Sequence, residues 1–477
     1  MKREAAIVAV IIVVLLVSAL GYEALVAGSG PASTSRSTNS SVVTMSSSIS
    51  SVGCGLPPDQ PATDWTTYHG NNSRNADAGP TGGRLLSCVR PGWKSQALDG
   101  QVYAEPLVYR GIVVVATEKD NVYGLNLTSG ATVWVARLGT PVDGSSLPCG
   151  DINPTGITGT PVINPVTGTV YVVAFEAPGA HYLVALDAHS GSIRFTEPAD
   201  PSGANPLVQQ ERSALSLGNG RVYVMYGGLA GDCGDYNGWV VGFNADGTGS
   251  MVSYEVPSQR GAGIWAPSGA AMDLAGNLFV ATGNGASTGS FDFSNSVIEL
   301  SPSLQEMAYF APTDWARLNT GDTDLGSVGP MILGHGELFQ VGKEGVGYLL
   351  DADALGGVGG QLFSDHVCSS AFGGTAQSGS VVFVSCTDGL VALNTTSYSF
   401  SVLWRGPSYP AGPPIVTGGE VWVVDTSSGE LFGYSVHNGS QIYSAPTGSV
   451  TRFTTPSTSG GWVLVAAGDE VYSFLLG

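Results

Sequence analysis

Short runs of apolar residues, each opened by a glycine, recur along most of this chain. A glycine begins such a run at eight positions, and a second apolar run follows each of them a few residues later. The openings lie 40 to 60 residues apart, with no helical period between them. Paired strands that repeat at this length are typical of the blades of a β-propeller. The pattern therefore predicts an all-β, eight-bladed propeller over residues 64–477. The openings are Gly111, Gly168, Gly220, Gly276, Gly336, Gly379, Gly419 and Gly461.

The two ends of this array are incomplete. The last repeat, residues 451–477, has room for only about three strands, and an extra extended segment precedes the first repeat. Because a closed ring leaves no exposed strand edge, we expect residues 93–98 to form the outer strand of the final blade. Trp134 and Trp404 lie near the ends of blades, and we expect them to pack between neighbouring blades.

The first 53 residues differ in composition from the repeats. Lys2 and Arg3 precede an unbroken run of apolar or small residues, 5–20. As a helix this run would be ~24 Å long, slightly short of a typical hydrocarbon core. Residues 29–53 include fourteen Ser or Thr and cannot bury enough apolar surface to fold. We expect residues 1–28 to be a transmembrane anchor or signal sequence and residues 29–53 to be a disordered stalk. The propeller would then lie outside the cell, held at the membrane or secreted if the leader is cleaved.

The charge balance narrows the range of partners. Charged residues make up 12% of the chain, and the formal net charge is −20. A chain without a basic stripe cannot neutralise phosphates, so nucleic acid is excluded as an expected partner. Five Asn-x-Ser/Thr sequons predict a glycosylated external surface. They begin at Asn39, Asn71, Asn126, Asn394 and Asn438.

The six cysteines are an even number, as expected of a disulfide-bonded exported protein. We expect Cys368 and Cys386, on adjacent strands of one blade, to form a disulfide. Cys149 with Cys233 would join two long loops, and Cys54 with Cys88 would pin the segment that leaves the stalk. The sequence alone permits fifteen connectivities, so these pairings are hypotheses. No CxxC pair is present, which argues against a zinc site.

Several segments resemble the pyrroloquinoline-quinone-like propeller family, which contains the quinoprotein alcohol dehydrogenases. They are DWTTYHGNNSRN, NVYGLNLTSGATVW, HYLVALDAHSG, IWAPSGAAMDLAGNLFVATGNG and VGKEGVGYLLDADALGG. The resemblance covers about residues 64–477 and implies an eight-bladed propeller. In the enzymes of this family, calcium and an anionic quinone lie at the mouth of the central channel.

The resemblance also implies candidate site residues. Asn284 falls where the family places an amide ligand of calcium, Asp292 lies near the position of the catalytic base, and Lys343 resembles the cation that contacts the quinone. The chain lacks the adjacent cysteine pair of the dehydrogenases and the CxxCH haem attachment sequence. These departures argue against bound quinone and calcium.

A carboxylate cluster offers a second kind of chemistry. Asp322 and Asp324 lie in a long glycine-bearing loop, and secreted relatives with this propeller hydrolyse tetrathionate. A carboxylate in such a loop could activate water. Because ligands of propellers bind where loops converge, we expect Asp324 and Lys343 to lie in one channel mouth.

Two classes of function follow. The first is a membrane-tethered binding or scaffold module for an unknown extracellular ligand or protein. The alternative is a secreted enzyme, either a quinone-dependent dehydrogenase or a tetrathionate hydrolase, with Asp322 and Asp324 as its catalytic residues. We favour the first because the cofactor signatures are incomplete.

Overall fold

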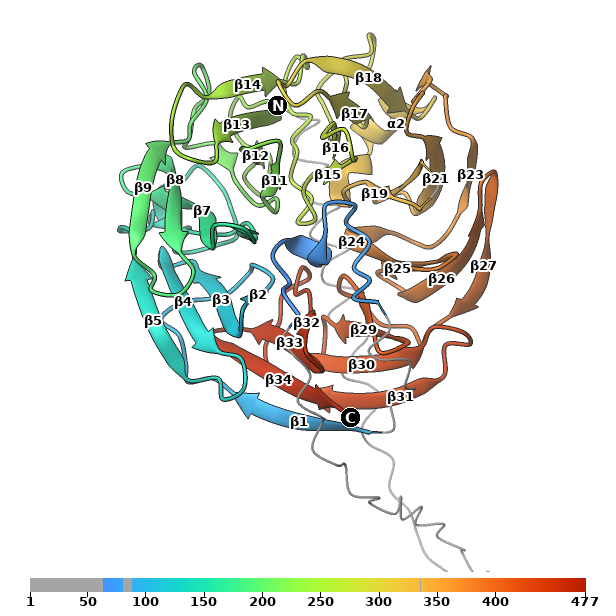
Figure 1. Cartoon of the computed structure of the whole chain (residues 1–477). Coiled ribbons are helices and arrows are strands. Elements are labelled where there is room, and N and C mark those ends of the chain that lie inside the picture. Colours follow the sequence, from blue (N-terminus) through green and yellow to red (C-terminus); the bar gives the residue numbers. More distant parts are fainter. Residues whose placement is uncertain (1–62, 80–87, 335) are drawn as a thin grey trace, which may run out of the picture. The chain divides into compact units, whose positions relative to one another are not determined.

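Eight β-sheets surround a common axis in a computed structural model (Figure 1). It describes residues 63–79, 88–334 and 336–477, all of which belong to one compact unit. In most sheets the strands follow one another outward from the axis in chain order, with antiparallel pairing between neighbours. The exceptions are β1, which is the outer strand of the last sheet, and β22, which pairs parallel with β18. This confirms the predicted all-β, eight-bladed propeller.

The blades are the following sets of strands. The first blade is β2 (Leu107–Tyr109), β3 (Ile112–Thr117), β4 (Asn121–Asn126) and β5 (Thr132–Arg137), and the second is β6 (Val162–Asn164), β7 (Thr169–Glu176), β8 (Ala180–Asp187) and β9 (Ile193–Pro198). The third blade is β10 (Gln209–Gln210), β11 (Ser216–Gly218), β12 (Arg221–Gly228), β13 (Trp239–Asn244) and β14 (Val252–Glu255). The fourth blade is β15 (Ala271–Met272), β16 (Leu278–Ala281), β17 (Val297–Leu300), β18 (Glu306–Ala311) and β22 (Gly357–Val358). The fifth blade is β19 (Met331–Ile332), β20 (Glu337–Val341), β21 (Val346–Asp351) and β23 (Phe363–His366), and the sixth is β24 (Ala371–Ser378), β25 (Val381–Cys386), β26 (Gly389–Thr396) and β27 (Ser399–Arg405). The seventh blade is β28 (Ile415–Thr417), β29 (Glu420–Asp425), β30 (Glu430–Ser435) and β31 (Gln441–Pro446). The eighth blade is β32 (Ser457–Ser459), β33 (Trp462–Ala467), β34 (Glu470–Leu476) and β1 (Val89–Lys94). Short helices are η1 (Tyr68–Gly70), η2 (Gly144–Ser146), α2 (Trp315–Thr320) and η3 (Leu325–Ser327).

The glycine-opened runs become the second strand of each blade. All six residues of β29 are buried, because this strand lies inside its sheet and between two neighbouring blades. Outer strands such as β9 are mostly exposed or half-buried. Strands covered on both faces therefore have continuous apolar sequence, and outer strands do not.

The ring closes as predicted, but the closing strand begins earlier. β1 pairs with β34 in the eighth blade. We expected residues 93–98 to form it, whereas the strand spans Val89–Lys94 and contains Pro91. An outermost strand tolerates a proline because only one of its edges needs hydrogen-bond donors. Backbone bonds from Ser95 to Val471 and from Leu98 to Asp469 continue the contact beyond the strand.

Tryptophans on outer strands join neighbouring blades, as predicted for Trp134 and Trp404. The indole of Trp134 donates to the Ala188 carbonyl of the next blade at 3.1 Å, and that of Trp404 donates to Val436 at 3.2 Å. A glycine with positive φ lies under each ring, Gly191 and Gly439 respectively, where a Cβ would come within 3 Å of the indole. Each turn must therefore be glycine for the blades to approach this closely.

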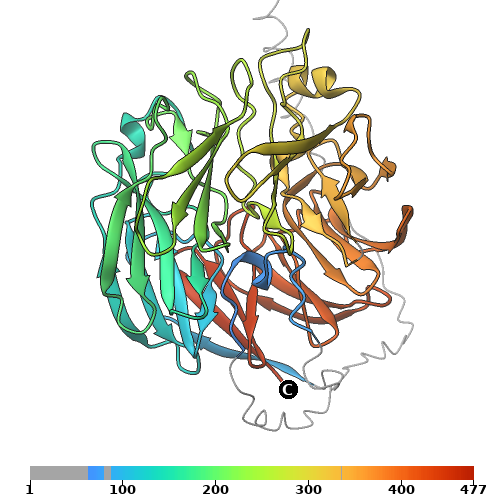
Figure 2. The same ribbon diagram turned by 45° about the horizontal axis from the view of Figure 1, so that its top comes forward.

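The polar segment before the first blade occupies the centre of the ring. Residues 63–79, drawn in blue in Figures 1 and 2, contact the first strand of every blade. In the sequence, this segment was notable only for its resemblance to the pyrroloquinoline-quinone-like propeller family. Its hydrogen-bond partners are Thr63 with Ser459, Trp65 with Val108, Thr66 with Ile163, Asn72 with Leu217 and Met272, Ser73 with Ile332, Asn75 with Gln377, and Ala76 with Val416. We call these residues the central segment.

Arg74 is the most deeply buried cation of the central segment, with 1% of its surface exposed. Its guanidinium donates five hydrogen bonds. The acceptors are Ala270 O (2.9 Å), Thr67 Oγ1 (2.6 Å), Tyr68 O (3.0 Å), Leu215 O (3.0 Å) and Ser216 Oγ (2.7 Å). Glu105, also buried, accepts from the Trp65 indole at 2.8 Å and from His69 N at 2.9 Å. The segment is thus held by charge and hydrogen bonding as well as by packing.

Four carboxyl groups of the first three blades are buried: Glu105, Glu118, Asp120 and Glu211. Burial raises the pKa of Glu118 to about 7. Burial, with the nearby charges of Glu176 and Glu118, raises the pKa of Asp120 to about 8. The pKa values of Glu105 and Glu211 are raised well above the ordinary value, again chiefly by burial. The folded state therefore binds protons more tightly than the unfolded chain.

No helix in the described ranges has the length and apolar character needed to span a membrane. The predicted anchor and stalk, together with Cys54 and Asn39, lie outside the described residues.

We predict that Arg74→Met will lower the free energy of unfolding by roughly 3–5 kcal/mol, because five buried acceptors lose their donor. Denaturant unfolding measures this loss. Arg405→Met is the matched control, since Arg405 is exposed on the outer strand β27. Equal stability of the two variants would contradict the role of Arg74.

We also predict that stability falls as the pH rises from about 4 to about 8. A raised folded-state pKa contributes stability below the unfolded value, and this is lost as the pH rises through the folded value, by up to about 1.4 kcal/mol per pH unit for each group. Melting temperatures across this range test the slope. Glu118→Gln and Asp120→Asn should each flatten it, and an unchanged slope in both variants would exclude these two groups as its source.

Candidate functional site at the channel mouth

A cavity of about 400 Å³ lies where loops of several blades converge. Its charged lining residues come from segments that connect two blades or that join two strands of the same blade. They are Asp151, Arg212, Asp232, Asp322, Asp324, Lys343 and Arg452. Three aromatic residues, Trp265, Phe372 and Phe453, complete the wall. The hydroxyls of Tyr68, in the central segment, and Thr455 are 3.1 Å apart, so the central segment reaches to within two residues of Phe453.

Lys343, Asp322 and Asp324 meet in this pocket. Lys343 lies in the turn between β20 and β21, and its Nζ is 2.8 Å from Asp324 Oδ2 and 3.1 Å from Asp322 Oδ1. Burial works against the charge of Lys343, but the two carboxylates outweigh it and raise the pKa of this lysine. The ammonium is therefore charged and already paired.

Asp324 is 4% exposed and uses both of its oxygens. While Oδ2 faces Lys343, Oδ1 accepts a 2.7 Å hydrogen bond from the backbone N–H of Asn284. Asp322 is 68% exposed and reaches solvent at the rim. The two aspartates thus differ, since only Asp322 has a carboxylate accessible to a ligand.

Asn284 and Asp292 lie beside the pocket and are not among its lining residues. Asp292 is buried, and its Oδ1 accepts a 2.7 Å hydrogen bond from Ser294 Oγ. Its Oδ2 has no partner among the described residues. The Asn319 amide bridges this loop, accepting from Gly285 N at 2.8 Å and donating to Ser294 Oγ at 2.8 Å. Asp292 therefore belongs to a hydrogen-bonded loop rather than to the pocket surface.

Pyrroloquinoline quinone and calcium do not fit this arrangement. The cation expected to contact the quinone is paired with two carboxylates, and the expected amide ligand and base lie outside the pocket wall. Calcium prefers six to eight oxygen ligands around one point. Within the described part of the chain, the one cluster of three potential metal-binding His, Cys, Asp or Glu side chains lies elsewhere, at Cys368, Cys386 and Asp388.

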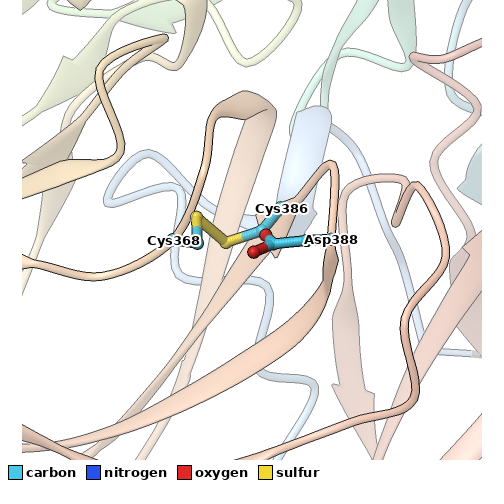
Figure 3. Close-up of side chains that lie close together, drawn as sticks. All are labelled: Cys368, Cys386 and Asp388. Carbon is cyan, nitrogen blue, oxygen red and sulfur yellow. A yellow bond between two sulfur atoms is a disulfide. The ribbon is translucent and has the colours of Figure 1, made fainter.

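That cluster is a structural disulfide rather than a metal centre (Figure 3). Both sulfurs are bonded to each other, so neither can act as a thiolate ligand. Asp388 accepts a 2.9 Å hydrogen bond from Ser369 Oγ and fixes the loop. The predicted pairings Cys368–Cys386 and Cys149–Cys233 are both confirmed. The third prediction involves Cys54, which lies outside the described residues.

Sequence reasoning missed the arginine side of the pocket. Arg212 and Arg452 lie over the Phe453 ring, with their Cζ atoms 5.4 Å and 5.9 Å from its centroid. Arg452 also lies 5.4 Å from the centroid of Phe372. One signal was available, because the chain has only 18 Lys and Arg residues and these two lie a few residues before the inner strands β11 and β32.

Comparisons with known proteins agree with the fold. A family profile described as outer membrane protein assembly factor BamB matches residues 90–353, more than half of the chain. A search of curated proteins gives no match. Quinohemoprotein alcohol dehydrogenase ADHIIG from Pseudomonas putida HK5 superposes with a TM-score of 0.68 at 14% identity, over 87% of this chain and 80% of that one.

Two further solved structures share this architecture. A europium-containing methanol dehydrogenase has a TM-score of 0.68 at 14% identity, over 87% of this chain and 98% of that one. BamB from Moraxella catarrhalis has a TM-score of 0.57 at 16% identity, over 82% of this chain and 98% of that one. At these identities the likeness shows the fold alone. With the profile match, the eight sheets and the resembling segments together, the chain belongs to the pyrroloquinoline-quinone-like β-propeller family.

Proposed function

We propose that this chain is a non-catalytic binding module that holds an extracellular ligand or protein partner at its channel mouth. The observation that carries the proposal is that the ammonium of Lys343 is already paired with two carboxylates. Asp324 and Asp322, at 2.8 Å and 3.1 Å, satisfy the charge that a quinone would otherwise use. A pocket with fixed ion pairs and aromatic walls is suited to recognition, because its groups are already oriented before a ligand arrives.

The location of the module is part of the proposal. Two disulfides support an oxidising compartment, since cytosolic thiols are kept reduced. The apolar run 5–20 would anchor the chain, and the Ser/Thr-rich residues 29–53 would hold the propeller away from the membrane. Among the sequons, Asn394 and Asn438 are exposed and are the proposed glycan sites. Asn71 is a poor site because its amide donates to Asn75 within the central segment.

Hydrolysis of a polythionate is the weaker alternative. Asp322 has an accessible carboxylate at the rim and could activate water. Asp324 is less suited, because its two oxygens are occupied by Lys343 and by the Asn284 N–H.

The purified chain, mixed with pyrroloquinoline quinone and either calcium or a lanthanide, should not reduce a dye with primary alcohols as donors. It should also leave tetrathionate intact. Both outcomes are expected because Lys343 is paired with Asp322 as well as with Asp324. A quinoprotein dehydrogenase reconstituted in the same buffer is the positive control. Turnover of either substrate that disappears in Asp322→Asn or Asp324→Asn would overturn the non-catalytic proposal.

A further inference from the structure

The charges of the channel-mouth pocket are separated into two ends. Lys343 is outnumbered at one end by Asp322 and Asp324, whereas at the other end Arg212 and Arg452 outnumber Asp151. Trp265 and Phe453 lie between the two groups. The pocket is therefore dipolar, with an acidic end, an aromatic middle and a basic end.

The basic end has unused capacity for an anion. Among the described residues no carboxylate pairs with Arg452, whose guanidinium rests only on Phe372 and Phe453. Arg212 is 13% exposed, and its single carboxylate contact is a loose one, 3.7 Å from the largely exposed Asp151. Burial lowers the pKa of Arg212, the nearby charges of Asp151, Glu118 and Tyr103 oppose this effect, and that of Arg452 adds to it. Two guanidinium groups beside one aromatic ring can both donate hydrogen bonds to a carboxylate.

The acidic end has unused capacity for a cation. Asp322 is 68% exposed, so part of its carboxylate faces solvent although Lys343 lies 3.1 Å away. Asp232 also lines the pocket, but its Oδ1 already accepts a hydrogen bond from the Tyr236 hydroxyl and its backbone carbonyl accepts one from Arg260. With Asp322 and Asp324 against one lysine, this end attracts a second ammonium group.

The aromatic middle sets the distance between the two ends. Lys343 Nζ lies 5.6 Å from the Trp265 ring centroid, and the Trp265 and Phe453 rings are 6.4 Å apart in an edge-to-face arrangement. Arg212 and Arg452 lie on the far side of this pair, over Phe453. A ligand that bridges the ends must therefore carry its two charges several ångströms apart, with an apolar body between them.

We propose that the pocket binds a short, zwitterionic peptide, with its carboxylate at Arg452 and Arg212 and its ammonium at Asp322. This proposal rests on the proposed function and names its ligand class. A peptide of two or three residues spans ~7–10 Å at roughly 3.3–3.6 Å per residue. The 400 Å³ cavity can hold such a ligand. An acidic macromolecule is disfavoured, because the chain itself carries a net charge of −20.

The peptide Ala-Phe-Ala is the probe, compared by calorimetry with its N-acetylated and C-amidated forms on the purified chain. Each cap removes one charge and should weaken binding about tenfold or more, the usual effect of losing a charge-assisted hydrogen bond. Equal binding of all three peptides would overturn the proposal. Preferential binding of a polyglutamate peptide would do the same.

Two variants assign each charge to its end of the pocket. In Arg452→Gln the loss of affinity caused by amidation should become smaller, because only Arg212 is left to bind the carboxylate, while the loss caused by acetylation should remain. In Asp322→Asn the loss of affinity caused by acetylation should disappear while the loss caused by amidation remains. Asparagine suits this site because the backbone φ of residue 322 is 49°. Arg405→Gln, on the outer strand β27, is the matched control and should keep both losses. A general loss of packing would weaken all three peptides alike, so unchanged ratios in both variants would refute the assignment.

The outcome separates this inference from the proposed function. If the wild type binds no form of the peptide at millimolar concentration and also shows no turnover, the ligand class is wrong and the binding-module proposal stands. If the peptide binds with the predicted charge dependence while the chain oxidises alcohols or hydrolyses tetrathionate, the ligand class stands and the non-catalytic proposal fails.

Discussion

The innermost edges of eight sheets must be covered, and the rest of the structure depends on how this is done. A strand at the centre of a propeller has unpaired backbone groups that cannot all be left buried without partners. The central segment satisfies at least one such group, or a neighbouring side chain, in every blade. Arg74 then connects the first strands of the third and fourth blades through Leu215 and Ala270. Ring closure therefore takes place at the axis as well as at the β1–β34 seam.

A rigid ring explains how charges can be placed at the mouth. The chain has few cations, yet three of them line one pocket. Each is supported by an aromatic ring, and Lys343 by two carboxylates in addition. Loops held on blades lose little further conformational freedom when a ligand binds, so such an arrangement can favour recognition without rearrangement.

The sequence predicted the blades because their signal is local. An apolar run opened by a glycine and the second run that follows it form one hairpin, and residues close together in the sequence determine this hairpin. Trp134 could be assigned for the same reason, since its position at the end of a blade repeats at Trp404. The start of β1 was misplaced because Pro91 resembles a strand breaker, although an edge strand accepts it. The role of the central segment was missed because its contacts lie up to several hundred residues away and leave no periodic trace.

The candidate site was predicted only where its residues come from neighbouring blades. Asp324 and Lys343 lie 19 positions apart, at adjacent points of the ring, and their 2.8 Å contact follows from the order of the blades. Arg212 and Arg452 are 240 positions apart in sequence, and only the complete ring brings both to Phe453. Chemistry on a shared scaffold depends on such convergent groups rather than on the scaffold itself. In this chain the lysine that resembles a cofactor contact has two carboxylate partners, while the arginines across the mouth lack close ones. The Lys343 side therefore has no free cation for an anionic group, whereas the Arg452 side has one.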